Sequence, residues 1–68
     1  MLAENLTKNL RRLREKKDLS REALSKRCGV SSSFIQGIEH GRRTPKLPII
    51  EAIAAGLGVD PRRLFADP

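Results

Sequence analysis

Apolar residues recur at intervals of three and four residues along much of this chain, which is the spacing of one face of an α-helix. Near the start the recurring positions are Leu6, Leu10 and Leu13. Further on they are Leu47, Ile50, Ile53, Ala54 and Leu57. No segment shows a competing strand pattern. The spacing therefore predicts an all-α protein, with helices over residues 3–17 and 47–57.

Two shorter helices joined by a tight turn are predicted between these segments. Ser20 and Ser31 each stand at a helix start, where a serine side chain accepts a backbone N–H that has no partner within the helix. Gly29 ends the first of the two, because glycine adopts at little steric cost the left-handed conformation that closes many helices. The expected helices span residues 21–28 and 32–40.

A fifth helix is expected over residues 61–66. Asp60 can cap its start, and Pro61 fits the first helical position. The chain shows no internal repeat, linker or low-complexity segment, so we expect residues 1–68 to form a single domain. Phe34 and Phe65 are the only aromatic residues. The core should therefore consist mainly of Leu, Ile, Val and Ala.

The segment LSREALSKRCGVSSSFIQGIEHG, from Leu19 to Gly41, has the layout of a helix-turn-helix DNA reader. Three further segments extend the pattern on both sides of this motif. They are LRRLREKKDLS before it, GVSSSFIQGIEHGRRTP in and after it, and LGVDPRRLF at the end. With them the chain resembles the lambda-repressor-like (XRE) helix-turn-helix family of phage repressors, Cro proteins and restriction-modification controllers, from about Leu6 to Phe65. The resemblance implies a compact five-helix DNA-binding domain whose second and third helices form the motif.

The charge balance agrees with a nucleic-acid partner. Fourteen Lys and Arg against eight Asp and Glu give a net charge of +6, which favours a polyanion such as double-stranded DNA. Binding to a membrane is the weaker alternative, because the apolar runs are short and no amphipathic segment pairs aromatic residues with a cationic face. The N-terminal residues MLAENLTKNLRR lack the apolar run of a secretory signal, so we expect a cytoplasmic protein, associated with the nucleoid when bound to DNA.

Residues suited to catalysis or metal binding are scarce. The single cysteine, Cys28, excludes an internal disulfide, and neither Cys28 nor His40 lies in a cluster with metal-ligand spacing. With one histidine and no phosphate-binding loop, there is little from which to build an active site. We therefore expect no enzyme, no metal, no cofactor and no small-molecule ligand. Cys28 is interpreted as a small core residue, with a redox sensor as the alternative.

Base contacts are expected near the start of the second motif helix, because a recognition helix enters the major groove at that end. In the family that the chain resembles, the residues matching Ser32, Ser33 and Gly37 often contact base edges. Gln36 joins them because its amide can pair with N6 and N7 of adenine. Alternatively, the two serines are helix-start residues exposed to water. Phe34 is expected to pack at the edge of the core, with a thymine contact as the alternative.

Phosphate contacts are expected from the loop after the recognition helix, which in the resembled family runs beside the DNA backbone. The candidates are Arg42, Arg43, Thr44 and Lys46, with His40 at the edge. Such contacts fix the register of the protein on DNA and supply most of the nonspecific affinity.

Arg21 departs from the family pattern, in which the first position of the second helix commonly holds a glutamine. That glutamine grips a phosphate and braces the recognition helix. An arginine can also grip a phosphate, and its longer side chain can reach O6 and N7 of guanine. Arg21 is therefore a candidate for both kinds of contact, with a solvated surface arginine as the alternative.

The resemblance also implies a structural ion pair. Arg14 and Glu39 match family residues that tie the first helix to the end of the recognition helix through a partly buried pair. Replacing Glu39 with alanine is expected to loosen the recognition helix and leave Arg14 unpaired.

One DNA-binding domain of this size covers only a few base pairs, so we expect a homodimer on two half-sites about one DNA turn apart. The interface is expected on the last two helices. Its candidate residues are Ile49, Ala55, Arg62 and Leu64. Alternatively, Ile49 is an isolated exposed apolar residue, which is normal on a protein surface.

These expectations predict a sequence-specific DNA-binding transcriptional regulator, a repressor that occupies a palindromic operator as a homodimer. Activation stays open, because some related controllers also contact RNA polymerase. The alternative function is that of an antitoxin or adaptor, which uses the same fold to bind a protein.

Overall fold

The computed structural model describes residues 2–67, with side chains from residue 4 onward. Every regular element in this range is helical. The four α-helices are α1 (Leu2–Lys16), α2 (Arg21–Cys28), α3 (Ser32–Glu39) and α4 (Leu47–Leu57), and the 3₁₀ turn η1 (Pro61–Leu64) follows them. The all-α expectation is confirmed, and each α-helix begins and ends within one residue of its expected bounds.

The expectation of a fifth α-helix over residues 61–66 is wrong, because η1 is a single 3₁₀ turn. Asp60 caps its start, accepting the N–H of Arg62 at 2.9 Å. These cap and proline signals mark where a helical turn starts but not how far it continues. From Leu64 onward two backbone carbonyls bond to α1 instead, because the Nδ2 of Asn9 donates to the carbonyls of Leu64 and Ala66 at 3.1 and 2.6 Å.

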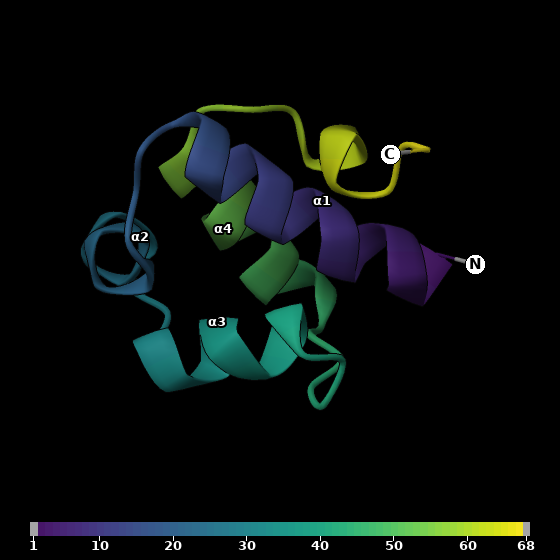
Figure 1. Ribbon diagram of the computed structural model, residues 1–68, viewed down its shortest axis with the longest axis horizontal. Coiled ribbons are helices and arrows are strands. Elements are labelled where there is room, and N and C mark those ends of the chain that lie inside the picture. Colours follow the sequence, from purple (N-terminus) through teal and green to yellow (C-terminus); the bar gives the residue numbers. More distant parts are fainter. Residues whose placement is uncertain (1, 68) are drawn as a thin grey trace.

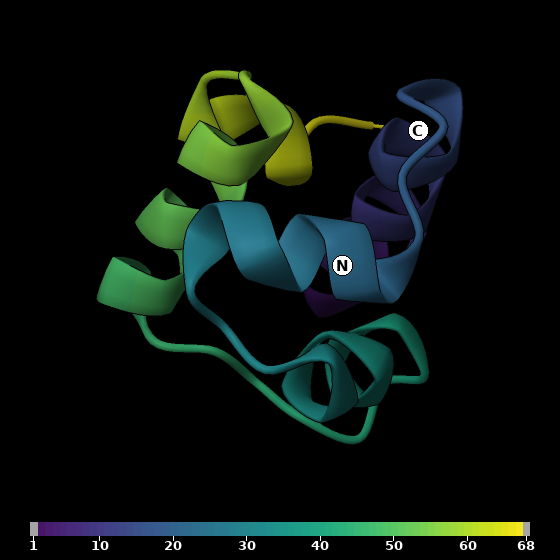
Figure 2. The same ribbon diagram turned by 90° about the vertical axis from the view of Figure 1, so that its left-hand side faces the viewer.

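The helices surround one core, with α3 at an edge of the molecule. α1 packs on α3 and η1, while α2 packs on α3 and α4. In both ribbon views α3 is the lowest helix (Figures 1 and 2), and in Figure 2 α2 lies directly above it. The loop that follows α3 runs along the same edge before it reaches α4 (Figure 2). One side of α3 therefore has no other helix against it.

The core draws residues from all five elements. Its buried apolar members are Leu6, Leu10, Leu13, Leu24, Val30, Ile35, Ile38, Ile50, Ile53, Ala54, Leu57 and Leu64. The expectation that Leu47 belongs to this set is wrong, since Leu47 is 63% exposed. It is the first residue of α4, and at this end of the helix the buried residue is Pro45, from the preceding loop.

Close packing of α2 on α4 depends on one glycine. A Cβ atom added at Gly56 would lie 2.9 Å from the Cβ of Cys28, closer than two carbon atoms can approach. Cys28 is half-buried and packs against the core at the end of α2, and Gly29 then turns the chain with a φ of 73°. This end of α2 therefore presses directly on α4.

Candidate DNA-reading surface

Two serine caps and a glycine fix the position of α3 relative to α2. The Ser20 hydroxyl accepts the N–H of Ala23 at 3.0 Å, and the Ser31 hydroxyl accepts the N–H of Phe34 at 3.1 Å. Gly29 lies between the two helices in the left-handed conformation that a glycine favours. α2 and α3 therefore form a helix-turn-helix with a short connection.

Two isoleucines hold α3 against the core. Ile35 and Ile38 are fully buried, and they lie one helical turn apart. On the opposite side, Ser33 and Gln36 are exposed. Ser32 and Gly37, the other two residues expected to contact bases on α3, are half-buried. The helix thus presents a polar side chain from each of its first two turns to the solvent.

The loop after α3 adds a run of cations beside this polar side. Arg42, Arg43, Thr44 and Lys46 are all exposed, as is His40. The backbone N–H groups of Arg42 and Arg43 both donate to the carbonyl of Gly37, at 2.7 and 3.2 Å. These bonds fold the loop back against α3, so its positive charges stay close to the helix.

Arg43 lies over α3 rather than extending from it. Its guanidinium carbon is 5.7 Å from the centre of the Phe34 ring, within the range of a cation–π contact. A Cβ atom at Gly37 would lie 2.5 Å from the Cγ of Arg43. Gly37 therefore makes room for this arginine, a role that the spacing of the sequence did not indicate. Phe34 itself is half-buried against the core, in the packing position expected for it.

Arg14 and Glu39 lie against each other inside the molecule. Arg14 donates from Nε to Oε2 of Glu39 at 2.7 Å and from Nη2 to Oε1 at 3.1 Å. Its Nη1 donates to the carbonyl of Leu19 at 2.7 Å. Arg14 therefore joins α1 both to the start of the motif and to the buried carboxylate at the end of α3.

Arg21 joins the same carboxylate, which sequence analysis did not predict. Its Nε donates to Oε1 of Glu39 at 3.1 Å, and its side chain is 30% exposed. The substitution of arginine for the usual glutamine of the resembled family was visible in the sequence. The partner was not, because Glu39 lies eighteen positions away along the chain.

The two arginines set the protonation of Glu39. Burial alone raises the pKa of this carboxyl, but hydrogen bonds and charge attraction from Arg14 and then Arg21 outweigh it, and the pKa lies below its ordinary value. The hydrogen bond to Glu39 likewise raises the pKa of Arg14 against the opposing effect of burial. Glu39 and Arg14 are therefore both charged at neutral pH.

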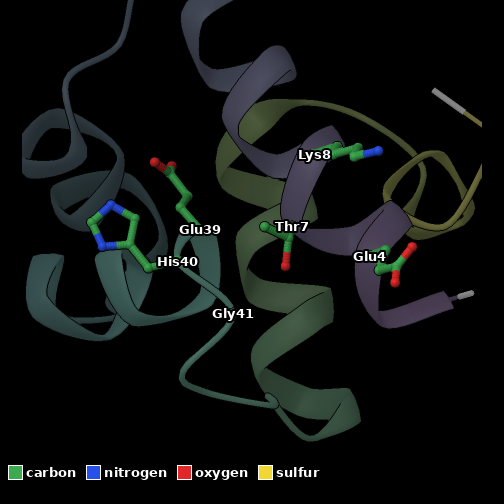
Figure 3. A pocket seen from close by; sticks show the side chains of 6 residues that line it. All are labelled: Glu4, Thr7, Lys8, Glu39, His40 and Gly41. Carbon is green, nitrogen blue, oxygen red and sulfur yellow. The ribbon is translucent and has the colours of Figure 1, made fainter.

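A shallow hollow of about 350 Å³ lies between the start of α1 and the end of α3 (Figure 3). Its lining residues are Glu4, Thr7, Lys8, Glu39, His40 and Gly41. Figure 3 shows that Glu39 and His40 point away from Thr7, while Glu4 and Lys8 point outward from α1. The Thr7 hydroxyl donates to the carbonyl of Ile38 at 3.1 Å. The hollow therefore lacks the converging polar groups of a ligand site.

Residues 2–67 contain no group of three or more His, Cys, Asp or Glu side chains placed to hold a metal ion. Within the same range, each helix is too short or too polar to cross a bilayer.

Residues 6–65 match the family of helix-turn-helix domains. The chain belongs to this family. Control protein C.MunI from a Mycoplasma species is 38% identical over 63 residues, which make up 93% of this chain and 82% of that protein. The match confirms the family resemblance, over the bounds that the sequence segments indicated.

Two crystal structures share the fold. The restriction-modification controller protein C.AhdI from Aeromonas hydrophila superimposes with a TM-score of 0.87 and 38% identity, over 90% of this chain and 92% of that one. The hypothetical transcription factor NHTF from Neisseria superimposes with a TM-score of 0.93 and 34% identity, over 100% of this chain and 78% of that one. The family is one of DNA-binding regulators rather than of enzymes.

Proposed function

We propose that this chain binds a palindromic operator in double-stranded DNA as a homodimer and represses transcription by occupying a promoter. Its family and its similarity to controller proteins make it a DNA-binding transcriptional regulator. The observation that carries the proposal is the open side of α3, where Ser33 and Gln36 are exposed beside a loop that exposes Arg42 and Lys46. A polar helix face bordered by cations fits a major groove bordered by phosphates.

The two parts of this surface have separate roles in the proposal. Ser32, Ser33 and Gln36 contact base edges and supply sequence preference, while the loop cations contact phosphates and supply affinity. Each phosphate neutralised steepens the dependence of log K on log salt by about 0.9. Among the loop cations, Arg43 rests on Phe34 of α3. We expect the protein to act on DNA in the cytoplasm. Activation is the alternative to repression, in which a protein bound beside a promoter contacts RNA polymerase.

Selection from a random duplex library at near-physiological salt tests the proposal. The expected result is a two-fold symmetric motif with half-sites about one DNA turn apart. Gln36→Ala should relax the preference at one position per half-site, at a cost of about 1–3 kcal/mol for the preferred base pair. Lys46→Ala should weaken binding to every sequence and reduce the salt slope by about 0.9.

Lys8→Ala is the matched control for Lys46→Ala, because Lys8 is equally an exposed lysine but lies on α1. It should change neither the motif nor the slope. Retention of DNA without any motif contradicts the proposal and favours the adaptor alternative, in which a protein is the main partner. A motif that survives Gln36→Ala unchanged contradicts the base contact of Gln36 alone.

The dimer in this proposal forms through the exposed side of α4 and η1. Leu47 is the one large apolar side chain among the described residues that is mostly exposed, and Ala55 and Arg62 are exposed as well. Ile49 is half-buried against the core. Leu64, expected at the interface, is fully buried, so its side chain belongs to the core instead. Leu47 therefore takes its place among the candidates.

Leu47→Glu tests this interface at little risk to the fold, because the side chain is already mostly exposed. Sedimentation of the variant should give a folded monomer where the wild type gives a dimer. Binding to a palindromic operator should weaken at least tenfold, while binding to a single half-site changes little. A variant that stays dimeric contradicts the assignment of Leu47.

A further inference from the structure

One carboxylate in this protein serves two arginines that differ in their surroundings. The Arg14 side chain is 10% exposed and faces the interior. Its guanidinium donates hydrogen bonds to the carboxylate of Glu39 and to the carbonyl of Leu19. Arg21 is 30% exposed and, among the described residues, makes its side-chain hydrogen bond through Nε alone. The two terminal amino groups of Arg21 thus keep their donors for a ligand that approaches from outside.

We propose that Glu39 positions Arg21 to bind a DNA phosphate, so that the buried carboxylate orients a DNA contact in addition to joining α1 to α3. The inference rests on the proposed DNA-binding function and deepens it. It makes Arg21 a phosphate contact, where the sequence left base and phosphate contacts open, and it makes Glu39 a positioning residue.

The charges of the cluster favour an anion at Arg21. Two guanidinium groups share one carboxylate, which leaves one excess positive charge. Arg14 is enclosed by protein, so a phosphate can approach the excess charge only through Arg21. A bound phosphate would complete an alternating series of Arg14, Glu39, Arg21 and phosphate. A guanidinium is suited to the last step, because its fork of donors matches two phosphate oxygens.

The tether favours a phosphate over a base. Glu39 is the last residue of α3, whereas the base-reading end of a recognition helix is its start. Glu39 lies seven positions after Ser32, which is about 10 Å along the helix axis at 1.5 Å per residue. Arg21 is therefore held at the end of α3 that lies away from the groove floor. A tethered side chain has also lost rotamer freedom during folding, so binding DNA orders it less.

Four proteins test the inference: the wild type, Arg21→Lys, Glu39→Gln and the double variant. Affinity for the selected operator is measured over a range of salt concentrations, below the melting temperature of every protein. Lysine keeps the charge of Arg21, but its single ammonium group lacks the separate donor nitrogens of a guanidinium. It therefore cannot bind the carboxylate through one nitrogen and a phosphate through the others. We expect Arg21→Lys to weaken binding about tenfold.

The decisive result is the coupling between the two positions. Glu39→Gln should weaken DNA binding by a large factor when residue 21 is arginine. When residue 21 is lysine, that factor should be at least fivefold smaller, because the tether is then already lost. A merely structural role of Glu39 would lower the melting temperature and weaken binding by the same factor in both backgrounds. Equal factors therefore overturn the inference.

Arg11→Lys is the matched control, since the Nε of Arg11 also faces a glutamate, Glu15, at 3.4 Å, but on the exposed side of α1. It should bind DNA as the wild type does. Should Glu39→Gln fail to fold, Arg21→Lys against Arg11→Lys remains decisive, and an affinity within twofold of the wild type overturns the inference. A wild type that binds no DNA overturns the proposed function and this inference together. Specific DNA binding with independent effects overturns the inference alone.

Discussion

Asn9 is a polar residue whose removal should cost this small protein a large part of its stability. It is fully buried on α1 between Leu6 and Leu13, and its Nδ2 donates to two carbonyls of the C-terminal segment, at Leu64 and Ala66. Its Oδ1 accepts from Nη2 of Arg12 at 3.1 Å. Asn9→Ala removes both donors at once. The carbonyl of Leu64 is then left in the interior without its partner.

The cost follows from what happens to each carbonyl. An acceptor that stays buried without a partner costs about 1–3 kcal/mol, and one that water can reach loses about 0.5–1.5 kcal/mol. Leu64 is in the first situation and Ala66, an exposed residue, in the second. The expected loss is about 3 kcal/mol, in a domain whose total stability is about 3–10 kcal/mol. The melting temperature should fall by about 10–25 °C.

Thermal and urea unfolding followed by circular dichroism, at one fixed protein concentration, measure this loss. Asn5→Ala is the matched control. Asn5 is the same residue type one turn earlier, and it reaches the same C-terminal segment through two longer contacts of 3.4 Å, one of them exposed. Its removal should cost less than about 0.5 kcal/mol. A loss below about 1 kcal/mol for Asn9→Ala refutes the reasoning, since it would mean that the C-terminal turn is held by packing alone.

Three further predictions concern the motif and its support. Because Arg14 and Arg21 hold the pKa of Glu39 below its ordinary 4.5, the stability that this group provides is present at neutral pH and is lost as the pH falls below about 4.5. Melting curves from pH 7 to pH 3 should therefore fall more steeply for the wild type than for Glu39→Gln, and parallel curves would contradict this. Gly37→Ala should displace Arg43 from Phe34 and weaken operator binding several-fold, with a stability change below about 1 kcal/mol because alanine suits a helix better than glycine; unchanged affinity in a titration would exclude a role for that contact. Gly56→Ala should instead push α2 from α4 and destabilise the protein by about 1–3 kcal/mol, so a rise in melting temperature would show that the helices can separate without cost.

The helix bounds could be predicted because their causes are local. A cap, a left-handed glycine and a stripe of apolar residues each act within one or two turns of the chain, and Ser31 and Gly29 show this directly. Predictions failed where tertiary packing decides the outcome. Leu47 follows the apolar spacing of α4, but Pro45 is the residue buried at that end. η1 ends early because the carbonyls of Leu64 and Ala66 accept hydrogen bonds from Asn9, which lies fifty-five positions before Leu64.

The candidate site likewise has features that could be predicted from local spacing and features that could not. The polar side of α3 follows from helical spacing, which is why Ser33 and Gln36 are exposed opposite Ile35 and Ile38 as expected. What Gly37 and Arg21 do could not be read from spacing, because each depends on a side chain from another element.

Both Asn9 and Arg21 nevertheless left a signal in the sequence. Asn9 is a polar residue that shares the apolar face of α1 with Leu6 and Leu13, and such a residue is tolerated only if its hydrogen bonds are satisfied inside the protein. Arg21 is a charged residue where the resembled family commonly has a neutral one, and the added charge could find a partner within the fold. In each case the departure from a local rule indicated a tertiary contact but not the residue at its other end. The three-dimensional structure supplied that partner, the C-terminal carbonyls for Asn9 and the carboxylate of Glu39 for Arg21.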